Sequence, residues 1–147
     1  MPAIPVLTDI VDPVTAEVLA ANQQLLDAIA AGDWTTYRGL VADDITCFEP
    51  EARGHLVQGL AFHEFYFKLS DGKPQPPKHL TTTMVAPRVR LLSDTVALVA
   101  YVRLVQKLDE AGRPITTEAE ETRLWQRQGG SQAGAWKHVH FHRSLPA

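Results

Sequence analysis

Four long strand-like runs fill the second half of the chain, and they limit the folds open to it. The runs are HLTTTMVAPRVRLL (79–92), TVALVAYVRLVQKLD (95–109), ITTEAEETRLWQRQ (115–128) and AWKHVHFHRS (135–144). They are rich in β-branched and aromatic residues, and short segments of turn-forming residues separate them. Because strands joined by short connections pair as hairpins, these runs predict an antiparallel meander.

The first half of the chain carries helical patterns instead. Asp12 can cap a helix that has Pro13 at its first position, and Gly32 can end it. Apolar residues recur between these signals at helical spacing. The expected helices cover residues 13–31, 34–42 and 60–69, and a short strand covers 45–49. Helices followed by strands predict an α+β fold, with three N-terminal helices packed on one face of a curved antiparallel sheet.

Length, charge and the N-terminus limit the class of protein. The 147 residues suit an N-terminal arm over 1–12 and a single domain over 13–147. The net charge of −3 and the lack of a basic stripe argue against a nucleic-acid partner. There is no signal-peptide pattern and no apolar run of about 20 residues, so no membrane segment is expected. With Cys47 as the single cysteine, we expect a soluble, cytoplasmic protein.

Four motifs occur in a set order along the chain. They are FEPEARGHLVQGLAFHEFYF, AYVRLVQKLDEAGRP, EETRLWQR and WKHVHFHRS. Together they closely resemble the association (hub) domain of calcium/calmodulin-dependent protein kinase II, over roughly Ala16 to Ser144. The resemblance implies a nuclear transport factor 2-like (SnoaL-like) cone that assembles with itself into dimers or rings of dimers. The sequence lacks a kinase glycine-rich loop and an HRD-type catalytic loop, so we expect no kinase activity of its own.

Three arginines lie inside or at the ends of apolar strand runs: Arg103, Arg123 and Arg143. In the family that the chain resembles, the matching arginines line a deep pocket that binds small carboxylates such as hydroxybutyrate. The resemblance therefore implies that these three bind a small carboxylate. Tyr101 and His79 are further candidate contacts, although Thr81 takes the place of the family's histidine and His79 lies two residues before it. A guanidinium suits a carboxylate because its planar fork can donate two parallel hydrogen bonds.

The same arginines have a structural alternative. A buried guanidinium needs an acidic partner, because leaving it alone costs several kcal/mol. Three glutamates on the next strand are candidates across the hairpin: Glu118, Glu120 and Glu121. In this alternative the arginines form an internal ion-pair network and no free anion site remains.

Glu49 precedes Pro50 at the end of the short strand. In ketosteroid isomerase-like relatives of this fold, an aspartate at the matching position is a general base. A carboxylate enclosed in an apolar cone has a raised pKa, which suits base catalysis near neutral pH. Glu49 is thus the candidate catalytic residue for an isomerase-like or hydratase-like enzyme.

The third expected helix carries four aromatic residues: Phe62, Phe65, Tyr66 and Phe67. They surround a short helix, so one face should fill the core while the rest needs another surface to cover it. We therefore predict that these residues form a subunit contact. The alternative is that all four lie in the core.

His138, His140 and His142 alternate along the last strand run. Strand geometry predicts that all three face one way, a spacing that can hold a metal. No nearby cysteine or second histidine cluster completes such a site. We expect packed, hydrogen-bonded histidines and neither a metal nor a cofactor.

Three functions stay open on the sequence: a self-assembling hub-like domain that binds a small carboxylate, a small enzyme that uses Glu49, and an oligomerisation scaffold. The interior of the cone distinguishes them. A cavity that reaches Glu49 keeps the enzyme possible, a cavity that reaches only the arginines favours binding, and a filled interior favours the scaffold.

Overall fold

The structure is a computed structural model that describes residues 12–74 and 78–146. The helices are α1 (Pro13–Ala31), α2 (Trp34–Leu40) and α3 (Ala61–Lys68), with short 3-10 helices at Pro50–Ala52 and Gln128–Gly130. The strands are β1 (Val41–Phe48), β2 (Val57–Gln58), β3 (Thr81–Ser93), β4 (Val96–Leu108), β5 (Pro114–Arg127) and β6 (Trp136–Ser144). Apart from Asp12, the predicted N-terminal arm lies outside the described residues.

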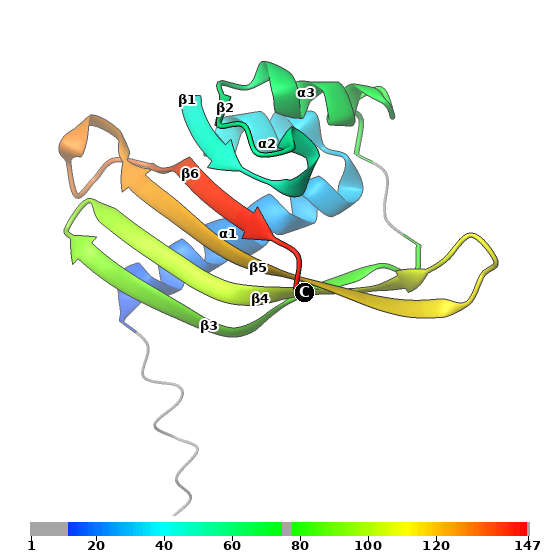
Figure 1. Cartoon of the computed structure of the whole chain (residues 1–147). Coiled ribbons are helices and arrows are strands. Elements are labelled where there is room, and N and C mark those ends of the chain that lie inside the picture. The colour runs from blue at the N-terminus through cyan, green and yellow to red at the C-terminus, as the bar shows by residue number, and fades with distance from the viewer. Residues whose placement is uncertain (1–11, 75–77, 147) are drawn as a thin grey trace, which may run out of the picture.

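The strands form one curved sheet in the order β2-β1-β6-β5-β4-β3. β3, β4, β5 and β6 pair as an antiparallel meander, whereas β6 pairs with β1 in parallel. Figure 1 shows the three helices on the same side of this sheet, within its concave face. The predicted α+β fold, with N-terminal helices on a curved antiparallel sheet, is therefore confirmed.

α1 is held by its caps and by one buried amide. The Asp12 side chain accepts hydrogen bonds from two backbone N–H groups of the first turn, and Gly32 ends the helix with a φ of 67°. In the middle, Asn22 donates to the Tyr101 hydroxyl and accepts from Trp125 Nε1, both at 3.0 Å. These bonds fix α1 across β4 and β5. No helix in the described parts of the chain, α1 included, is long and apolar enough to cross a membrane.

The junction between the second helix and the strand that follows it differs from the sequence-based expectation. The second helix ends at Leu40 rather than at residue 42, and β1 starts at Val41 rather than at residue 45. The cause is a long-range pairing, since Val41 lies opposite His138 and Cys47 lies opposite Phe141. Parallel pairing of β1 with β6 therefore extends the strand into residues whose local pattern favours a helix.

The prediction that the three histidines of β6 share one face is wrong. The pairing of β5 with β6 shifts between Leu124 and Trp125, so that His138 lies opposite Trp125 and His140 opposite Leu124. His138 is fully buried and stacks on the core residue Phe141. A β-bulge thus turns His138 into the core and leaves the other two histidines on the opposite face.

Candidate functional site

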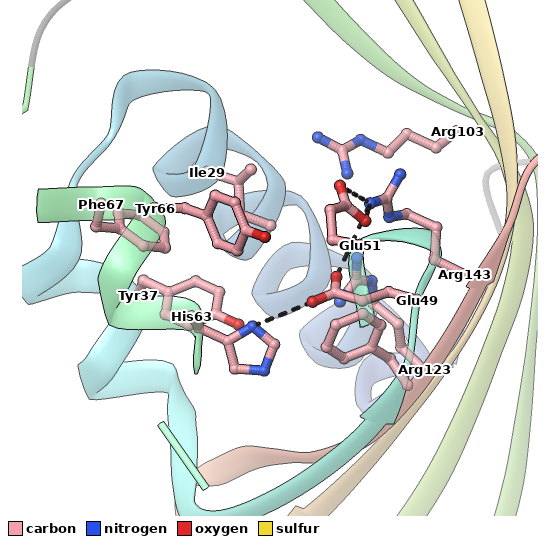
Figure 2. Close-up of a pocket in the computed structure, with 11 residues that line it drawn as sticks. Ile29, Tyr37, Glu49, Glu51, His63, Tyr66, Phe67, Arg103, Arg123 and Arg143 are labelled. Carbon is pink, nitrogen blue, oxygen red and sulfur yellow. Dashed lines mark hydrogen bonds and ion pairs between the residues drawn. The ribbon is translucent and has the colours of Figure 1, made fainter. Parts of the chain in front are cut away.

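A cavity of about 310 Å³ lies between the sheet and the helices, and we call it the first cavity. Its lining residues are Ile29, Tyr37, Glu49, Glu51, His63, Tyr66, Phe67, Arg103, Arg123, Phe141 and Arg143. Figure 2 shows the arginines on the sheet side and the side chains of Tyr37, Tyr66 and Phe67 on the helix side, with the two glutamates between them. The interior of the cone is thus open, and it reaches both the predicted arginines and Glu49.

Glu121 is the acidic partner of two of the arginines. Its Oε1 accepts from the Tyr101 hydroxyl at 2.5 Å and from Arg123 Nη2 and Nε at 3.0 and 3.1 Å. Its Oε2 accepts from Arg103 Nη1 at 3.2 Å. Burial alone would raise the pKa of Glu121, but Arg123 and Arg103 outweigh it and lower that pKa. The internal network considered from the sequence is therefore present.

Arg123 belongs wholly to that network. The residue is 1% exposed, its guanidinium lies 4.4 Å from the centre of the Phe141 ring, and its Nε also donates to the Tyr101 hydroxyl at 3.0 Å. Burial works against its charge, but Glu121 outweighs burial and the pKa of Arg123 is raised. Arg123 thus supplies permanent positive charge to the floor of the cavity, with its donors already largely engaged.

Arg143 already holds a carboxylate inside the cavity. Its Nη2 donates to both carboxylate oxygens of Glu51, at 2.5 Å for Oε2. The same nitrogen lies 3.8 Å from Glu49 Oε2. The Glu51 side chain is 41% exposed and the Arg143 side chain 17%. The partner of Arg143 is therefore an acidic side chain that can turn out into water.

Arg103 has a buried donor without a partner in the described parts of the chain. Beyond the bond from its Nη1 to Glu121, its buried Nε has no hydrogen-bond partner within the described residues. Figure 2 shows its guanidinium at the cavity, on the same side as the side chains of Arg123 and Arg143. Positive charge from three guanidiniums therefore converges on this space, which is the requirement for binding an anion.

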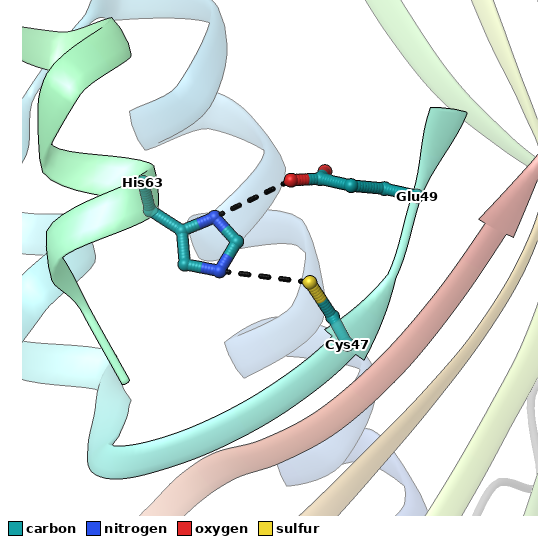
Figure 3. Close-up of side chains that lie close together, drawn as sticks. All are labelled: Cys47, Glu49 and His63. Carbon is teal, nitrogen blue, oxygen red and sulfur yellow. Dashed lines mark hydrogen bonds and ion pairs between the residues drawn. The ribbon is translucent and has the colours of Figure 1, made fainter. Parts of the chain in front are cut away.

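Glu49 lies in the environment expected for a raised pKa. Its side chain is 10% exposed, and burial together with the charge of Glu51 raises the pKa of Glu49. His63 Nδ1 lies 3.7 Å from Glu49 Oε1, and His63 Nε2 lies 3.7 Å from Cys47 Sγ. Figure 3 shows the imidazole with the carboxylate near one nitrogen and the thiol near the other.

The trio of Cys47, Glu49 and His63 has the residue types of a metal site. Glu49 lies near Nδ1 of His63 and Cys47 lies near Nε2, and these two nitrogens point in different directions. A single metal ion bound to one of the nitrogens would therefore be out of reach of the residue beside the other. Burial raises the pKa of Cys47 to about 12 and lowers the pKa of His63 to about 4. The thiol and the imidazole are therefore both neutral near pH 7, and the trio fits an internal polar contact.

The remaining predicted site residues occupy different places. Tyr101 uses its hydroxyl in the Glu121 network and does not line the first cavity, and neither does His79, which precedes β3. On α3, Phe67 is 8% exposed and packs against Trp34 and Tyr37, so it is core and cavity wall rather than a surface for a second subunit. Phe62 packs partly against the core.

Two α3 aromatics do point outwards. Phe65 is 61% exposed and Tyr66 42% exposed, and their rings meet edge to face at 5.2 Å. Tyr66 also lines the first cavity. The predicted subunit contact on α3 therefore narrows to these two side chains, because the helix turns the other two inwards.

Five residues that line the first cavity were absent from the sequence-based set, and three of them are polar: Glu51, His63 and Tyr37. Glu51 and His63 lie inside the FEPEARGHLVQGLAFHEFYF motif, so the motif could have indicated them. Tyr37 has no such signal, because a tyrosine on a short helix reads as an ordinary core residue.

Comparison with known proteins gives consistent matches along the chain. Residues 14–147 match the profile of the calcium/calmodulin dependent protein kinase II association domain. The chain is 42% identical over 128 residues to the delta subunit of calcium/calmodulin-dependent protein kinase type II from Oryctolagus cuniculus. The match covers 87% of this chain but only 23% of that subunit.

Solved structures agree in fold. The hub homology domain of calcium/calmodulin-dependent protein kinase II from Chlamydomonas reinhardtii has 50% identity and a TM-score of 0.79, covering 91% of this chain and 99% of that one. A nuclear transport factor 2-like superfamily protein from Salmonella enterica, 19% identical, has a TM-score of 0.68 and covers 90% of each chain. The second likeness concerns the fold alone, and it confirms the predicted cone.

Proposed function

The chain belongs to the calcium/calmodulin-dependent protein kinase II association domain family, and on that premise we propose that it is a self-assembling hub-like domain that binds a small carboxylate in the first cavity. The chain spans 23% of the length of the kinase subunit that it matches. We assign no kinase activity to these 147 residues, because the sequence lacks a kinase glycine-rich loop and an HRD-type catalytic loop.

The observation that carries the binding proposal is the pairing of Arg143 with Glu51. It supplies a carboxylate already seated on a guanidinium within a cavity of about 310 Å³. A ligand carboxylate that replaces Glu51 exchanges one ion pair for another, while the displaced side chain gains water. Because Glu51 is 41% exposed, we infer that turning it outwards costs no more than a surface ion pair, about 0.2–1 kcal/mol.

Electrostatics supports an anion over a cation or a neutral ligand. Three arginines face Glu49, Glu51 and Glu121, so charges are balanced while Glu51 stays on Arg143. When Glu51 turns away, the cavity carries an excess positive charge that a carboxylate neutralises. Burial disfavours the charge of Glu49 and raises its pKa, which acts in the same direction.

Calorimetric titration with acetate, butyrate and hydroxybutyrate tests the proposal. Wild type should bind in the micromolar to millimolar range, because a ligand of about seven heavy atoms offers few contacts. Arg143→Gln should weaken binding by about 30-fold or more. Glu51→Gln should strengthen it by about two- to fivefold, since it removes a competitor worth up to about 1 kcal/mol.

Arg113→Gln is the matched control, because Arg113 lies exposed between β4 and β5 and carries the same charge. It should bind like wild type. Absence of saturable binding to both wild type and Glu51→Gln would reject the ligand site and leave the oligomerisation scaffold.

The second candidate function is an isomerase-like enzyme with Glu49 as general base. Its support is the position of Glu49 on the cavity wall, where burial raises its pKa. If Glu49 removes a proton from a carbon acid, wild type should speed proton exchange on small ketones, and Glu49→Gln should abolish this while the chain stays folded. Exchange at the buffer rate with every ketone tried would dispose of this function.

A further inference from the structure

A second cavity, of about 300 Å³, adjoins the first. Ile29, Arg103 and Arg143 line both cavities. The remaining wall of the second cavity is built mainly from β3, β4 and β5, and includes Leu80, Thr82, Val105, Lys107, Thr117 and Ala119. The arginines that border the carboxylate site therefore also border a space beyond it.

Two buried polar atoms of the second cavity's lining residues lack a hydrogen-bond partner. They are Thr82 Oγ1 and Arg103 Nε, and neither finds a partner within residues 12–74 and 78–146. In the sheet, Thr82 lies opposite Val105 and Arg103 lies opposite Met84, so the two side chains are diagonal neighbours on one face. Buried polar atoms are nearly always satisfied, so two such atoms beside one cavity point to a polar group that binds there.

The second cavity is positively charged. Lys107 follows Arg103 and Val105 at alternate positions of β4, so it lies on the same face of the sheet. Lys107 has no ion-pair partner within the described residues. Glu118 borders the cavity, but it pairs with Leu104 in register, which turns its carboxylate to the opposite face.

We propose that the second cavity is a subsite for the far end of an extended ligand, and that this ligand is an α,ω-dicarboxylate. The inference rests on the proposed carboxylate site, because one carboxylate takes the place of Glu51 on Arg143. The other carboxylate lies in the second cavity, where it accepts from Arg103, Lys107 and the Thr82 hydroxyl.

The donors that line the second cavity determine which chemical group the far end of the ligand carries. An ammonium end, as in an ω-amino acid, would meet two cations, Arg103 and Lys107, and be repelled. A hydrocarbon end would leave the Thr82 hydroxyl and Arg103 Nε without partners. A carboxylate end satisfies both donors and neutralises the charge.

The test is a calorimetric comparison of dicarboxylates with monocarboxylates of equal carbon number. Succinate, glutarate and adipate are titrated beside butyrate, valerate and hexanoate, at constant ionic strength. The dicarboxylate of best-fitting length should bind about 10-fold more tightly than the monocarboxylate of equal carbon number. This factor corresponds to the weaker hydrogen bonds formed with charged groups, because Lys107 is exposed to water.

Variants of the second cavity test whether its residues cause the tighter binding of dicarboxylates. Thr82→Val, which keeps the shape of the side chain, and Lys107→Gln should each reduce the dicarboxylate-to-monocarboxylate affinity ratio by about threefold or more. Lys73→Gln removes the same charge from an exposed loop outside both cavities, so it should keep the wild-type ratio.

The outcomes separate the two proposals. If monocarboxylates bind and no dicarboxylate binds more tightly, the second subsite is rejected and the carboxylate site stands. The subsite is also rejected if both Thr82→Val and Lys107→Gln keep the wild-type dicarboxylate-to-monocarboxylate affinity ratio, or if Lys73→Gln lowers that ratio as much as they do. If no carboxylate binds at all, both proposals are rejected together.

Discussion

Replacing Glu121 by glutamine is expected to destabilise the fold severely. Glu121 is 2% exposed, and its carboxylate accepts hydrogen bonds from two guanidiniums and the Tyr101 hydroxyl. Glutamine keeps the size of the side chain and one acceptor oxygen, but it removes the negative charge. Arg123, itself 1% exposed, would then carry an uncompensated charge in the core.

The size of the effect follows from these burials. Removing one partner of a buried ion pair costs about 3–5 kcal/mol. Arg103 adds little, because its side chain is 15% exposed and is partly screened by water. In a chain of this size each kcal/mol lowers the melting temperature by about 2–4 °C, so Glu121→Gln should melt roughly 6–20 °C below wild type.

Melting curves at one matched protein concentration provide the measurement, because self-association makes melting temperatures concentration-dependent. Glu120→Gln is the control, since Glu120 is exposed on the same strand and has no ion pair within the described residues. It should change stability by no more than about 0.5 kcal/mol. If Glu121→Gln loses no more stability than this control, the Glu121 carboxylate does not stabilise the two buried arginines.

The same residue gives a signed pH dependence. The folded pKa of Glu121 is lowered from its ordinary value of 4.5. Its stabilising contribution is therefore fully present above pH 4.5 and is lost as pH falls through the lower folded value. The gap in melting temperature between wild type and Glu121→Gln should be constant near neutral pH and should narrow in strong acid.

Two further predictions concern pH and assembly. Burial, together with the charge of Arg123, lowers the pKa of His63 from 6.5 to about 4. Between these two pH values the unfolded chain binds a proton that the folded chain does not. The free energy of unfolding of wild type should therefore fall by on the order of 3 kcal/mol as pH falls from 6.5 to 4. His63→Asn should show a shallower fall in melting temperature over that interval, and equal slopes would contradict this. In sedimentation at micromolar concentration, wild type should have a mass well above 16.2 kDa, and Phe65→Asp should reduce it because a charge at a buried contact is costly. Leu108→Asp, the same kind of change at the end of β4, should keep the wild-type mass, and a monomeric wild type would disprove the assembly.

Local pattern was enough for most of the elements of this fold, and the motifs were enough for its family. The strand-like runs predicted β3 to β6 to within two residues at each end, because alternation and turn residues act over a few positions. Asp12, Pro13 and Gly32 bounded α1 for the same reason. The sequence also named the three arginines and Glu49, which the structure places around one cavity, because the motifs that resemble the family carry them.

Which charges meet was decided by tertiary structure. Arg143 pairs with Glu51 across 92 positions of sequence, a contact made when the last strand closes in parallel against the first. The register of β4 with β5 places Glu121 opposite Tyr101 on the concave face, whereas Glu118 and Glu120 lie on the other face. Because side chains alternate along a strand, a shift of one residue would exchange these faces. Register depends on the packing of the whole core, and local sequence pattern does not contain it.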